Sequence, residues 1–70
     1  MRFIVELERE TDGRWIAEIP EVPGALAYGP TREEAVSKAY AIALRAVADD
    51  VEQNPAKDPP QSISLECAIA

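Results

Sequence analysis

The side chains that could do chemistry in this 70-residue chain are mainly carboxylates, because the sequence holds 13 acidic residues, one cysteine and no histidine. Glu6, Glu8 and Glu18 fall on the polar side of two neighbouring segments, where paired carboxylates could hold Mg²⁺. Acids that lie side by side on an exposed strand are far more often a solvated face. We therefore expect no metal site and treat these acids as candidates for contact with a basic partner.

The nucleophilic side chains lack the partners that catalysis needs. Cys67 is predicted to face the core, where a thiol behaves as a small hydrophobic group. Ser62 and Ser64 alternate onto the polar side of the same segment beside Glu66, but no base accompanies them. The sequence thus predicts no catalytic residues, no enzyme and no cofactor. A Mg²⁺-dependent nuclease built on the acidic hairpin is the weakest alternative.

The net charge of −6 restricts the class of partner. Such a surface repels phosphate backbones, so we expect no direct binding to nucleic acid.

No apolar run approaches the roughly 20 residues that span a bilayer, and no signal peptide is visible. The single cysteine also fits a reducing compartment, and we expect a cytoplasmic protein with no membrane contact.

Alternating apolar residues predict four short strands. Residues 3–8 and 15–19 alternate on either side of Asp12-Gly13, a strong hairpin signal. A third strand at residues 25–28 lies between Pro23-Gly24, which suits a type II turn, and Gly29-Pro30. The final strand covers residues 62–69.

One long helix is predicted from about residue 32 to about residue 52. Thr31 is a suitable N-cap, and Glu34 completes a reciprocal capping box. Trp15 is expected to fill the core beneath this helix. The order is therefore β-β-β-α-β, an α+β two-layer sandwich with a small, mainly antiparallel sheet. We expect residues 1–70 to form a single domain with no separate C-terminal DNA-binding domain.

Apolar residues cover more than half of the helix circumference, whereas packing on one sheet needs a stripe only slightly wider than 100°. The surplus predicts self-association, as a dimer or a dimer of dimers. The two rims of the apolar arc are Tyr40, Leu44 and Val51 on one side, and Ala35 and Ile42 on the other. Alternatively, the proline-rich loop at residues 53–61 folds back over the rim.

The order and spacing of these turn and cap residues resemble the HicB-like antitoxin family of prokaryotic toxin–antitoxin systems. The resemblance rests on "DGRWIAEIPEVPG" followed by "YGPTREEA" and an alanine-rich helix. It covers roughly residues 3–50. The chain departs from many relatives at Ala25, where they carry cysteine, and at Pro30, where they carry an acid or lysine.

The resemblance implies an antitoxin-type module that binds and neutralises a small basic RNA-cleaving toxin of the HicA type. The acids expected to contact such a toxin are Glu6, Glu8 and Glu18 on the hairpin and Glu33 and Glu34 at the helix start. The alternative is a solitary homo-oligomer of the same fold with a structural or ligand-sensing role and no toxin partner.

Overall fold

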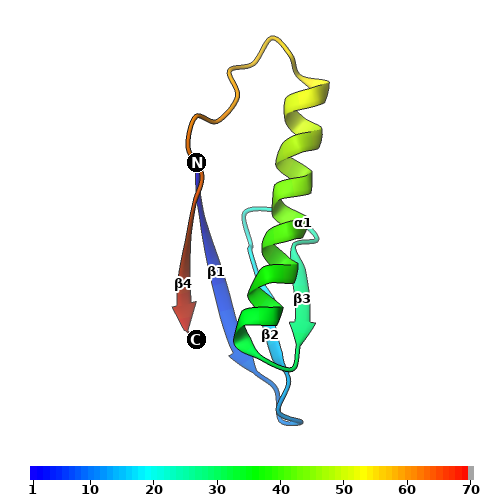
Figure 1. Cartoon of the computed structure of the whole chain (residues 1–70), viewed down its shortest axis with the longest axis vertical. Coiled ribbons are helices and arrows are strands. Elements are labelled where there is room, and N and C mark those ends of the chain that lie inside the picture. The colour runs from blue at the N-terminus through cyan, green and yellow to red at the C-terminus, as the bar shows by residue number, and fades with distance from the viewer. Residues whose placement is uncertain (70) are drawn as a thin grey trace.

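The computed structural model describes residues 1–69 and shows a four-stranded sheet with one long helix on one face (Figure 1). In chain order the elements are β1 (Arg2–Arg9), β2 (Trp15–Glu18), β3 (Leu26–Gly29), α1 (Arg32–Gln53) and β4 (Ser64–Ile69). The predicted α+β class and the β-β-β-α-β order are confirmed. Within residues 1–69 no helix combines the length and apolar character that crossing a membrane requires.

The strands lie in the order β3-β2-β1-β4. β1 pairs antiparallel with β2, and β2 pairs antiparallel with β3. β4 pairs parallel with β1, which is possible because α1 crosses over between β3 and β4. The sheet is therefore mainly antiparallel, and its two edges are β3 and β4.

Two glycines allow the tight turns that the sequence predicts. In the hairpin between β1 and β2, Gly13 has φ +92° and its N–H donates to the Glu10 carbonyl at 3.0 Å. At the next turn Gly24 has φ +86°, and the Ala25 N–H donates to the Val22 carbonyl at 3.1 Å. The left-handed conformation is open to glycine without a Cβ penalty, so both turns are confirmed.

The first turn of α1 carries half of the predicted capping box. The Thr31 hydroxyl oxygen accepts from the Glu34 N–H at 3.1 Å. The reciprocal bond from the Thr31 N–H to the Glu34 carboxylate is not formed within residues 1–69, and the Glu34 side chain is exposed. The N-cap alone therefore fixes where α1 begins.

α1 packs on the sheet through alanine. Ala35, Ala39 and Ala43 recur every four residues and are fully buried. The neighbouring strand also comes close, because a Cβ built on Gly29 would lie 2.8 Å from the Ala35 backbone nitrogen. The prediction that Ala35 lies on an outer rim is wrong, because this residue belongs to the central stripe that meets the sheet.

Trp15 lies on the helix-facing side of the sheet, but it is only half-buried and packs against the margin of the core. The Arg9 and Arg32 guanidinium carbons lie 5.8 Å and 5.7 Å from the centre of its ring. The Arg9 contact lies within the hairpin, and the Arg32 contact joins the hairpin to the start of α1.

Cys67 is exposed, so the prediction that it fills the core is wrong. Its neighbour Leu65, on the same side of β4, is only half-buried. The reason is the position of α1, which lies over β2 and β3 and reaches β1 only at its margin, while β4 stands clear of it (Figure 1). Periodicity correctly assigns these residues to the helix side of the sheet, but the helix does not cover them.

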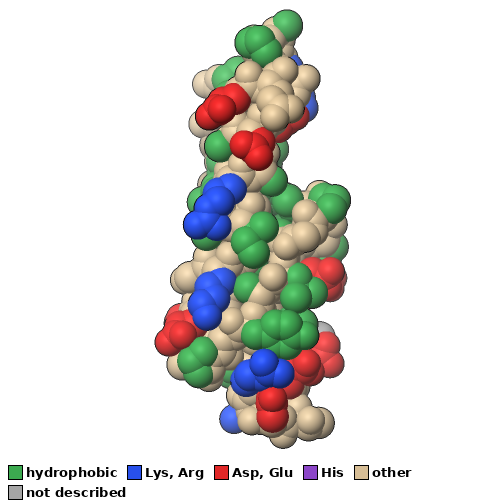
Figure 2. All heavy atoms as spheres, turned by 90° about the vertical axis from the view of Figure 1, so that its right-hand side faces the viewer, with side chains coloured by type: hydrophobic (Ala, Val, Ile, Leu, Met, Phe, Trp, Pro, Cys, Tyr) green, Lys and Arg blue, Asp and Glu red, His purple; other side chains and the backbone are tan. Residues whose placement is uncertain are grey.

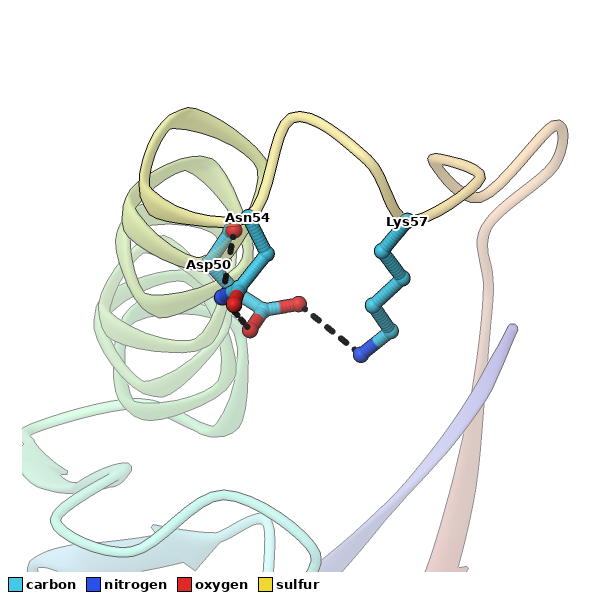
Figure 3. Close-up of polar contacts among 3 residues, drawn as sticks. All are labelled: Asp50, Asn54 and Lys57. Atoms are coloured by element: carbon cyan, nitrogen blue, oxygen red, sulfur yellow. Dashed lines mark hydrogen bonds and ion pairs between the residues drawn. The ribbon is translucent and has the colours of Figure 1, made fainter.

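The proline-rich loop after α1 is tied to the end of the helix. Asp50 accepts hydrogen bonds from the Asn54 side-chain amide at 3.0 Å and from Lys57 Nζ at 3.2 Å (Figure 3). Val51 borders a hollow of about 200 Å³ beside Lys57 and Pro59 and stays 38% exposed. Leu44, which lies well before the loop, is 37% exposed. The loop therefore does not cover the helix rim that contains Leu44 and Val51.

Candidate protein-binding surface

The sheet face opposite α1 carries exposed acids on the two central strands and exposed apolar side chains on the edge strand β3. Because side chains alternate along a strand, the neighbours of the buried Val5, Leu7 and Ala17 point away from the helix. We call this surface the outer face; its members on β1, β2 and β3 are Arg2, Ile4, Glu6, Glu8, Ile16, Glu18, Leu26 and Tyr28. The Arg2 guanidinium lies 3.5 Å from the Glu66 carboxylate of β4.

Three of the predicted contact residues meet on the outer face. In the register of β1 and β2, Glu6 lies directly opposite Glu18, and Glu8 lies opposite Ile16. All three carboxylates are exposed, and within residues 1–69 no Lys or Arg nitrogen lies within 4.0 Å of them. Like charges directly opposite each other weaken a sheet. The pairing of Glu6 with Glu18 therefore opposes folding.

Apolar side chains lie beside these acids. Leu26 and Tyr28 are each 40% exposed, and Ile16 is half-buried. Register places Leu26 opposite Glu18 and Tyr28 opposite Ile16. A hollow of about 90 Å³ is lined by Ile16 together with the three acids. Figure 2 shows apolar and acidic side chains next to each other along the right-hand flank of the molecule. Sequence reasoning missed Leu26 and Tyr28, although their alternation with Ala27 could have indicated them.

The hairpin turn holds one basic group at the border of the outer face. The Arg14 backbone N–H donates to Asp12 Oδ1 at 3.0 Å, and Arg14 Nε donates to Asp12 Oδ2 at 2.8 Å. The backbone bond, with help from the guanidinium, lowers the pKa of Asp12 below its ordinary value of 3.8. Asp12 thereby orients the Arg14 guanidinium, whose carbon lies 4.8 Å from the centre of the Tyr28 ring.

Glu33 and Glu34 lie apart from the outer face. Both are exposed in the first turn of α1, on the helix side of the sheet, where acids interact favourably with the helix dipole. The structure therefore does not bring them together with Glu6, Glu8 and Glu18. Contact of a partner with Glu33 and Glu34 stays a separate prediction.

An exposed surface of this composition is suited to binding a macromolecule. Aromatic side chains are enriched at protein interfaces, and here the exposed Tyr28 and Leu26 of the edge strand lie beside the acids of the two central strands. No group of three His, Cys, Asp or Glu side chains within residues 1–69 could hold a metal ion.

Comparison of the chain with protein-family models, with curated proteins and with solved structures finds no match. Function is therefore inferred from the outer face and from the motifs of the sequence.

Proposed function

We propose that this chain is a cytoplasmic protein-binding module that docks through its outer face on a small basic protein and neutralises it. The partner is an RNA-cleaving toxin of the HicA type. The observation that carries the proposal is the group of unpaired carboxylates formed by Glu6, Glu8 and Glu18 next to the exposed Leu26 and Tyr28.

The charge of the surface supports a basic partner. Complementary potentials accelerate the encounter of two proteins and suppress wrong partners. A protein that binds RNA commonly presents a basic patch, and an acidic face can occupy the same patch that RNA would bind. The resemblance of residues 3–50 to HicB-like antitoxins points to the same class of partner.

Charge also argues against a direct role on nucleic acid. Phosphate contacts supply most non-specific affinity for DNA and RNA, and a chain with net charge −6 opposes them. We therefore propose that the partner cleaves RNA and that this chain inhibits the partner.

Co-expression tests the proposal. We expect a small basic protein to be encoded beside this chain. Expressed alone in a host that lacks both genes, that protein is expected to arrest growth. Expression of this chain in the same cells is expected to restore growth, because the outer face blocks the RNA-binding surface. An empty vector is the control. Growth without arrest, or arrest that this chain fails to relieve, contradicts the proposed function.

A further inference from the structure

A second open surface lies on the helix side of the sheet, between α1 and β4. A hollow of about 350 Å³ there is lined by Leu7, Arg32, Glu33, Val36, Ser37 and Cys67. Along the same flank of α1 follow Tyr40, which packs edge-on against Phe3 with ring centres 6.5 Å apart, and the exposed Leu44. We call this surface the helix–β4 groove.

The dimensions of the two layers explain why the groove is open. Strands lie about 4.8 Å apart, so four of them make a layer about 19 Å wide, whereas a helix with its side chains is about 10 Å across. One helix therefore covers about half of this sheet. α1 occupies the half over β2 and β3, and the half that contains β4 has room for a second helix.

The size of the molecule agrees with an uncovered surface. A folded monomer of 7.6 kDa exposes about 4,300 Å², and this chain exposes 4796 Å². The large side chains of the core are few, namely Phe3, Val5, Leu7 and Ile19. A partner that filled the groove would add to this small core.

Charge decides which partner fits each surface. A two-fold contact places the same residues of two copies near each other. On the outer face this would bring Glu6, Glu8 and Glu18 of one copy near the same acids of the other, so charge repulsion opposes a second copy there. Along the groove the helix flank and β4 present the uncharged Val36, Tyr40, Leu44, Leu65 and Cys67. The two charged residues at its end, Arg32 and Glu33, have opposite signs.

We infer that the helix–β4 groove is the site where a second copy of this chain binds, with the α1 flank of each copy against β4 of the other. The same contact explains the surplus of apolar residues on the helix, and it adds Leu65 and Cys67 to the predicted self-association residues Tyr40 and Leu44. Val51 lies nearer the loop, at the end of the same flank.

Such a dimer leaves both outer faces free, one on each side of the assembly. If the proposed function holds, each face binds one basic protein, giving two partners per dimer. This consequence rests on the proposed function, whereas the dimer itself does not.

Two leucines of equal exposure provide the test. Leu44 is 37% exposed in the groove, and Leu26 is 40% exposed on the outer face. Sedimentation of the purified wild type at micromolar concentration is expected to give the mass of a dimer. Leu44→Glu is expected to halve that mass, while Leu26→Glu leaves it unchanged. Circular dichroism checks that both variants stay folded.

Cys67 offers an independent readout, because it is the only thiol and lies in the groove. Its alkylation is expected to slow as protein concentration rises in the wild type and in Leu26→Glu, and to be independent of concentration in Leu44→Glu. A monomeric wild type overturns the inference. An oligomer that Leu44→Glu leaves intact and in which Cys67 reacts freely overturns it too, since its interface lies elsewhere. Neither outcome bears on binding of a basic protein to the outer face.

Discussion

Replacing Ala39 with leucine is expected to lower the free energy of unfolding by about 1–3 kcal/mol, the usual cost of adding methylene groups to a packed core. Ala39 is fully buried at the centre of the stripe by which α1 meets the sheet. One turn earlier, a Cβ built on Gly29 would lie 2.8 Å from the Ala35 backbone nitrogen, so α1 and β3 are in close contact there. A 70-residue domain has a total stability of roughly 4–10 kcal/mol, so this change removes a large share of it.

Urea denaturation measures the effect, and Ala48→Leu is the matched control. Ala48 lies on the same helix but is exposed, so the same substitution is expected to change stability little, because alanine and leucine both favour helix. Equal midpoints for the two variants would show that α1 does not pack on the sheet through its alanine stripe.

Reversing the charge of both facing acids, Glu6→Lys with Glu18→Lys, is expected to weaken binding of the basic partner at least about 100-fold, or about 3 kcal/mol. Like charges brought together across an interface cost several kcal/mol, and this variant turns two attractions into two repulsions. The fold itself is expected to tolerate the change, because two lysines replace two facing glutamates and the like-charge pair remains. Calorimetric titration at low and moderate salt measures the affinity.

The control for this variant changes the net charge equally at another place. Asp49→Lys with Glu52→Lys alters two exposed acids near the end of α1, away from the outer face. This control is expected to bind within a few-fold of the wild type, with a slightly slower association from the loss of long-range attraction. Equal loss of affinity in both double variants would mean that total charge, and not the outer face, governs binding.

The local structure of this chain could be predicted because its signals are local. Asp12-Gly13 and Pro23-Gly24 specify turns through the backbone freedom of glycine, and Thr31 marks the helix start through its hydroxyl. The alternation of Glu6 and Glu18 with buried residues placed both acids on one face. Because a hairpin turn joins their two strands, the proximity of Glu6 and Glu18 could also be predicted.

What sequence reasoning missed depends on where α1 lies across the sheet. Alternation shows which side of a strand a residue occupies, but it does not show whether a helix covers that part of the sheet. Cys67 therefore seemed to belong to the core, although β4 is an edge strand that α1 leaves uncovered. Ala35 seemed to lie on a rim because a wide apolar arc does not reveal its own centre. The burial of Ala35 with Ala39 and Ala43 in the structure shows where that centre lies.

The central claim is that the outer face binds a small basic protein, and amide chemical shifts test it most directly. The isotope-labelled chain is titrated with the purified basic protein encoded beside it. The expected result is a set of shift changes at Glu6, Glu8, Ile16, Glu18 and Tyr28, with none along α1 and β4. No shift change, or changes confined to α1 and β4, would contradict the claim.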